Sequence, residues 1–128
     1  MSDKGSVLAV ISDTHVGSST ALAPLDFNVH SRSENEVQVT HANKLQKWLY
    51  GCWTDYWDHV FSLAKKRRLI VVHVGDCIDG LHHNSLQVMN EVEDQAEAFL
   101  ELMMPIVAKA DAFYGILGTS PSHAGQDG

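Results

Sequence analysis

The pattern of apolar and polar residues begins with three short, continuous apolar runs. They span residues 7–11, 69–74 and 112–117 and are rich in branched side chains. Runs of this length are typical of strands buried in a parallel sheet, where both faces of each strand are covered. We therefore expect three buried strands.

Two longer segments between these runs show helical periodicity. Residues 41–68 repeat apolar side chains at steps of three and four, and Thr40 precedes them as the expected N-cap. The apolar stripe of this first helix is formed by Leu45, Leu49, Trp53, Tyr56, Val60 and Leu63, widened by Trp48, Cys52, Trp57 and Phe61. The basic run at residues 65–68 is interpreted as the solvated end of this helix rather than as a nucleic-acid patch.

The second helical pattern opens at Ser85. Its predicted apolar face consists of Leu86, Met89, Val92, Ala96, Phe99, Leu100, Met103 and Val107. Pro105 lies inside this pattern, and because proline lacks a backbone N–H, we expect it to kink the helix or to end its regular part. The methionines are interpreted as packing residues, since soft sulfur does not suit a site with hard ligands.

Residues 17–40 follow neither pattern. Long connections without structure of their own are uncommon in compact domains, and they are often functional. We interpret this segment as an irregular loop that is either functional or a mobile insertion.

The predicted order is strand, helix, strand, helix, strand. This alternation favours an α/β fold with a parallel sheet and right-handed crossovers. Sheets of this class bind ligands beyond the carboxyl ends of their strands. The chain of 128 residues is about one domain in length, which we assign as residues 1–128.

Composition narrows the class of protein. Sixteen acidic and nine basic residues give a formal charge of −7, which disfavours binding of nucleic acid through a broad basic surface. Cys52 and Cys77 are not spaced as a metal pair or a disulfide framework. The polar N-terminus does not resemble a signal peptide, and no apolar run approaches the ~20 residues of a membrane span. We expect a soluble, cytoplasmic protein that does not bind membranes.

The residues suited to catalysis or metal binding follow the three predicted strands. Asp13 and His15 follow the first strand; Gly75, Asp76 and Asp79 follow the second; Gly118, Thr119 and His123 follow the third. Because parallel strands end at one edge of their sheet, we expect these side chains to converge. Asp13 and His15, two apart on an extended segment, would point to the same side and reach one ion. Gly75 and Gly118 would let the backbone turn tightly beside it.

These motifs carry a resemblance to a known family. "SDTHVG" and "VGDCIDG", with "GTSPSH" in third place, resemble the first three blocks of the calcineurin-like metallophosphoesterases, and "DGLHH" with the Trp-rich first helix is similar to their phage-encoded branch. The family has Gly-Asn-His in its third block, where this chain has Gly118, Thr119 and a histidine delayed to His123.

The resemblance implies an enzyme that hydrolyses phosphomonoesters or phosphodiesters at two divalent ions, with Mn²⁺, Fe or Zn²⁺ as the candidates. Asp13, His15 and Asp76 would hold the first ion, and Asp76 would bridge to the second. Thr119 would stand where the family's asparagine binds the second ion. His123 would orient the phosphate or protonate the leaving oxygen. The substrate would be phosphorylated, with a nucleotide or nucleic acid among the candidates, and a phage protein would act in the host cytoplasm.

The family completes its site with later histidines, which this chain lacks before Gly128. We therefore expect the N-terminal portion of a longer phosphoesterase, cut after its third motif. One alternative is a non-catalytic metal-binding or scaffold module. Another is an unrelated α/β domain that binds a phosphorylated ligand through one Mg²⁺.

Several other polar residues are weaker candidates. His82 and His83 lie in the loop before the second helix and are assigned to substrate contact or to a replaced ligand, with unremarkable surface residues as the alternative. Asp79 is expected to brace its loop or a neighbouring histidine. His73 lies inside an apolar strand, and we interpret it as a core residue with a satisfied hydrogen bond, with support of a metal ligand as the alternative. His30, His41 and His59 are interpreted as surface residues.

Overall fold

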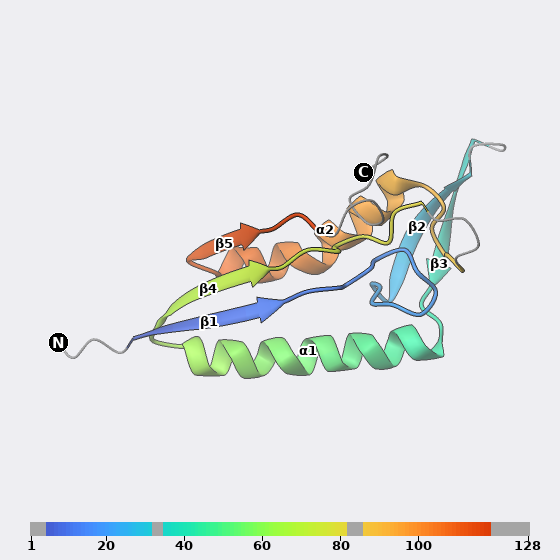
Figure 1. The fold of residues 1–128 in the computed structure, drawn as a ribbon. Coiled ribbons are helices and arrows are strands. Elements are labelled where there is room, and N and C mark those ends of the chain that lie inside the picture. Colours follow the sequence, from blue (N-terminus) through green and yellow to red (C-terminus); the bar gives the residue numbers. More distant parts are fainter. Residues whose placement is uncertain (1–4, 32–34, 82–85, 119–128) are drawn as a thin grey trace.

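A three-stranded parallel sheet forms the centre of the molecule. Its strands are β1 (Ser6–Ile11), β4 (Arg68–His73) and β5 (Ala112–Gly115), in the order β1-β4-β5. The structure is a computed structural model that describes residues 5–31, 35–81 and 86–118. Figure 1 shows the three strands side by side, all running in one direction. The predicted α/β class with a parallel sheet is therefore confirmed.

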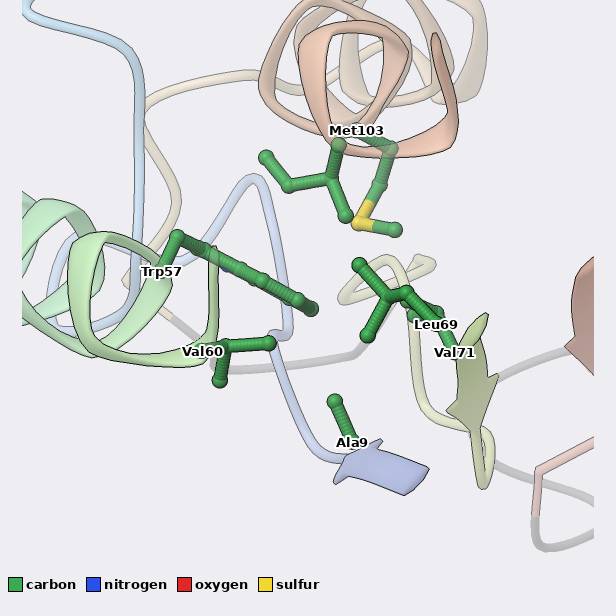
Figure 2. Close-up of a cluster of buried hydrophobic side chains, with 7 residues drawn as sticks. Ala9, Trp57, Val60, Leu69, Val71 and Met103 are labelled. Carbon is green, nitrogen blue, oxygen red and sulfur yellow. The ribbon is translucent and has the colours of Figure 1, made fainter. Parts of the chain in front are cut away.

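Both helices pack on the same face of this sheet. They are α1 (Lys44–Ala64), which precedes β4, and α2 (Val92–Lys109), between β4 and β5. The core beneath them joins Trp57 and Val60 of α1 and Met103 of α2 to Ala9 of β1 and Val71 of β4 (Figure 2). These side chains are almost fully buried, and burial of apolar surface on this scale is the main force that holds helices to a sheet.

The first helix is shorter than predicted at both ends. Its N-cap is Asn43, not Thr40, which belongs to a strand. Asn43 and Gln46 form a capping box, because each side chain bonds the backbone N–H of the other residue. The helix ends at Ala64, and Arg68 already belongs to β4.

The second helix begins later than predicted. Residues 86–91 are not helical, and the helix starts at Val92; Ser85 lies outside the described residues. Leu86 and Leu100, both assigned to the buried face, are 79% and 53% exposed. The helix also continues past Pro105 to Lys109, so proline does not end it, and the kink that we expected as the alternative stays a prediction.

The segment predicted as an irregular loop contains an antiparallel hairpin. Its strands are β2 (Asp26–Ser31) and β3 (Glu36–His41). The alternation of apolar and polar residues around Phe27 and around Val37 is typical of strands, so the expectation of an irregular loop was wrong for these residues. Within these two described strands, Phe27 is the only buried residue, and Val37 is 55% exposed.

Two histidines fix the hairpin in place. His30 and His41 are exposed, as expected, yet each ring bonds a carboxylate: His30 bonds Asp94 of α2, and His41 bonds Asp26 across the hairpin. The His30 backbone N–H also donates to Asp94 at 2.8 Å. Asp94 is nearly fully buried, so these bonds satisfy its carboxylate and tie the hairpin to α2.

Among the described residues, no helix covers the opposite face of the sheet. Leu8 and Val10 of β1 are 62% and 52% exposed, and Tyr114 of β5 is 59% exposed. Alternate residues of one strand therefore have opposite environments, since Ala9 lies between two exposed neighbours and is buried.

Replacing one valine by alanine on each face of the sheet should distinguish these two environments. Val71→Ala should lower the free energy of unfolding by about 2 kcal/mol, because Val71 is fully buried and a cavity would remain. Val10→Ala, the matched change on the open face, should lower it by less than about 0.5 kcal/mol. Urea denaturation of both variants measures the difference, and equal losses would contradict the one-sided core.

Candidate metal centre

The segments that follow β1 and β4 remain paired beyond the ends of their strands. The Asp13 N–H donates to the Gly75 carbonyl at 3.0 Å, and the His15 N–H donates to the Asp76 carbonyl at 3.0 Å. This pairing brings the two predicted motifs together at the carboxyl edge of the sheet.

Three candidate ligands converge there. Asp13, His15 and Asp76 each offer one ligand atom, and these atoms all lie within 4.8 Å of one another. Two carboxylates and one imidazole form a mixed oxygen and nitrogen donor set that suits Mn²⁺, Fe or Zn²⁺. The donor chemistry therefore fits one of the expected divalent ions.

The backbone reaches this arrangement in a way that the sequence analysis did not predict. Asp13 and His15 are not on an extended segment: both have positive φ, at 56° and 43°, and Asp76 has φ of 55°. Within the described residues, Asn35 is the only other non-glycine residue with positive φ. Non-glycine residues in this region are strained, and such residues cluster at functional sites.

The side chain of His73 forms hydrogen bonds with both segments that carry the candidate ligands. It is fully buried, its Nδ1 accepts the Gly75 N–H at 3.1 Å, and its Nε2 lies 3.0 Å from the Thr14 hydroxyl. Since Thr14 donates its own proton to the Cys77 carbonyl, the shared hydrogen must come from His73 Nε2. His73 is thus a neutral core histidine with satisfied hydrogen bonds that also holds residues adjacent to the candidate ligands.

Two glycines leave room for the Asp76 carboxylate. A Cβ on Gly118 would lie 2.1 Å from Asp76 Oδ1, and a Cβ on Gly75 would lie 2.6 Å from Gly118 Cα. Gly75 also has φ of 110°, whereas Gly118 is required for space alone. The segment that follows β5 therefore packs closely against Asp76.

Asp79 lies on the other side of His15. Its Oδ1 is 3.7 Å from His15 Nδ1, while Asp13 Oδ1 is 3.3 Å from His15 Nε2. Gln87 holds Asp79 by donating to its Oδ2 at 2.6 Å. Carboxylates therefore lie near both ring nitrogens of His15, and a carboxylate on the far side of a metal-binding imidazole helps to orient its ring.

Hydrogen bonds favour the ionised form of Asp13. Those from Ser12 and His15 hold the pKa of the Asp13 carboxyl below its usual value. A carboxylate that is already deprotonated near neutral pH binds a cation without first releasing a proton.

Two buried glutamines position the surrounding loops, and the sequence analysis missed both. Gln95 of α2 accepts the Gly80 N–H at 2.8 Å and donates to the Met89 carbonyl at 2.9 Å. Gln46 of α1 donates to the Ser18 carbonyl at 3.2 Å. The spacing of Asn43 and Gln46 signals a capping box in the sequence, but only the folded chain shows where Gln95 reaches.

The remaining predicted site residues lie outside the described residues. These are Thr119, His123, His82 and His83. The described part of the chain thus assembles one set of three candidate ligands, and the second ion expected from the resemblance stays a prediction.

Comparisons with known proteins do not identify a family. No family model, no curated protein and no solved structure matches the chain. Neither of the two described helices is both long and apolar enough to cross a membrane.

Burial lowers the pKa of His73 below its ordinary value of 6.5, although the negative charges of Asp13 and Asp76 oppose this. Because the unfolded chain then takes up the proton first, His73 contributes its full stabilisation above pH 6.5 and loses it as the pH falls through the window below that value. The stability difference between the natural chain and His73→Gln should therefore shrink on acidification. Denaturation at several pH values measures this, and a ring titration by NMR at or above 6.5 would contradict it.

Proposed function

We propose that this chain belongs to a metal-dependent phosphoesterase, in which Asp13, His15 and Asp76 bind a divalent ion. The observation that carries the proposal is the convergence of these three side chains on one point, each from a residue with positive φ. Capping or turn formation accounts for an aspartate at a strand end, but it does not account for His15 or for a shared point of convergence.

The chemistry is divided between the ion and the chain. A bound divalent ion would lower the pKa of its water and neutralise charge on the phosphoryl oxygens. The chain's own contribution is to keep the ligands ionised and oriented. Hydrogen bonds to Asp13 favour its ionised form, Asp79 lies near the second nitrogen of His15, and Gly118 leaves space for the Asp76 carboxylate.

Phosphoester hydrolysis is the reaction that the motifs support best. "SDTHVG" and "VGDCIDG" resemble the metallophosphoesterase blocks, and the described ligands are the ones that the resemblance assigns to the first ion. Thr119 and His123 are proposed to complete the site at the second ion and at the leaving group. The alternative is a module that binds an ion without turnover, and it predicts metal binding with no hydrolysis.

The proposal predicts that Asp76→Asn abolishes Mn²⁺-dependent hydrolysis of bis(p-nitrophenyl) phosphate and weakens Mn²⁺ binding at least about tenfold, because a charged ligand becomes a neutral one. Asp55→Asn, an exposed carboxylate on α1, is the matched control and should change neither. Calorimetry with Mn²⁺ and release of p-nitrophenol provide the measurements. Binding and turnover that survive Asp76→Asn would refute the site; binding without turnover in the full-length protein would favour the non-catalytic module.

The close approach of Gly118 to Asp76 generates a second test. Gly118→Ala should weaken Mn²⁺ binding, because the new methyl group would force the Asp76 carboxylate out of its position. Gly51→Ala is the control: a Cβ there meets nothing within 4 Å, and alanine in a helix should add about 0.5–1 kcal/mol of stability. Calorimetry gives the affinities, and equal affinities in the two variants would show that Gly118 does not set the position of Asp76.

A further inference from the structure

A cleft of about 570 Å³ lies directly beside the candidate metal centre. Asp13, His15 and Asp79 line it on the side of the loops, and α1 lines the opposite side. We call it the α1 cleft. Its volume is in the range of pockets that hold small organic ligands, and it exceeds what a phosphate group alone would fill.

The wall that α1 contributes is apolar and aromatic. Leu49, Trp53 and Tyr56 follow one another at helical steps of four and three, and Leu22 adds to the same wall. The apolar stripe of α1 divides between the two environments. Val60 packs on the sheet, whereas Leu49, Trp53 and Tyr56 line the cleft. Trp53 also packs against the buried residues of both core clusters.

A buried ring holds the two aromatic residues of this wall. Trp57 lies edge-on to Trp53 with ring centroids 5.5 Å apart, and edge-on to Tyr56 at 5.0 Å. Trp57 itself is only 3% exposed. A wall whose rings are already fixed binds a flat ligand at low entropic cost, since few side-chain rotations are lost.

The charges of the cleft narrow the class of ligand. No lysine or arginine is among the described residues that line it, and the chain as a whole carries a formal charge of −7. A polynucleotide would bring several phosphates that nothing there neutralises. A small ester with one phosphate could place that group at the metal centre, and its organic part would have to gain affinity from apolar contact.

We propose that the α1 cleft binds the planar aromatic ring of a small phosphoester, packed against Trp53 and Tyr56. The inference deepens the proposed function and rests on it for the phosphate end of the ligand. It assigns the ring end to residues that no metal-binding role requires.

Two inert phosphonates test the ring contact. In the presence of Mn²⁺, phenylphosphonate should bind about tenfold more tightly than methylphosphonate, which has the same charged group without a ring. Trp53→Ala should bring this ratio close to one and leave the affinity for methylphosphonate unchanged. Trp48→Ala is the matched control, because Trp48 lies on the same helix, is 66% exposed and does not line the cleft.

A second variant guards against misfolding of Trp53→Ala. Cys52 is exposed and lines the cleft, so Cys52→Trp should fill it without removing a core contact and should likewise abolish the preference for phenylphosphonate. Equal binding of the two phosphonates by the natural chain, or a preference for phenylphosphonate that both Trp53→Ala and Cys52→Trp retain, would overturn the inference. Methylphosphonate that still bound with Mn²⁺ would leave the proposed function standing.

A phosphate-free ligand separates failure of the cleft from failure of the metal centre. Adenosine is measured without metal by calorimetry. If adenosine binds and Trp53→Ala weakens this binding, the aromatic cleft is supported. This holds even if neither phosphonate binds with Mn²⁺, a result that would contradict only the proposed function. Adenosine binding points to a nucleoside ester, and preference for phenylphosphonate without it points to a simple aryl ester. Absence of both effects would overturn the cleft assignment.

Discussion

The pairing of the two segments that follow β1 and β4 is the constraint on which the candidate site depends. Parallel strands could diverge after their last ladder bond, yet here the Asp13 and His15 N–H groups continue to donate to the neighbouring segment. Each non-glycine residue with positive φ costs about 1–3 kcal/mol, and the surrounding structure must over-determine such residues. The continued pairing contributes to that determination for Asp13 and His15, because their N–H groups bond carbonyls of the neighbouring segment in this backbone conformation.

His73 connects this pairing to the core. Its ring lies edge-on to Phe99 of α2 at 5.5 Å, and its two nitrogens bond Gly75 and Thr14. A buried imidazole with both nitrogens satisfied costs little, whereas the same ring with one partner missing would be expensive. The core therefore enforces the loop geometry through a polar residue, and an apolar residue of equal size could not replace it.

The sequence predicted what depends on periodicity and strand order, and it failed where tertiary contacts decide. The three strands and the meeting of Asp13, His15 and Asp76 follow from apolar runs and from parallel topology. The left-handed backbone at these residues and the reach of Gln95 depend on contacts between segments far apart in the chain, which no local pattern encodes. The β2–β3 hairpin differs from these cases, because its alternation of apolar and polar residues is a local pattern that the sequence itself contains.

One helix face serves both the core and the α1 cleft. Trp57 is buried between the sheet and α2, while its edges contact Trp53 and Tyr56 at the cleft. The rings that line the cleft are thus held by the same residue that fixes α1 on the sheet. Packing in protein interiors is dense and transmits displacement. A change that shifts α1 on the sheet must therefore also move the cleft wall relative to Asp13, whose position is set independently by the loop pairing. The packing of the core therefore sets the distance between the metal ligands and the aromatic wall. Substitutions beneath α1 would change this distance without replacing a metal ligand or a residue of the wall.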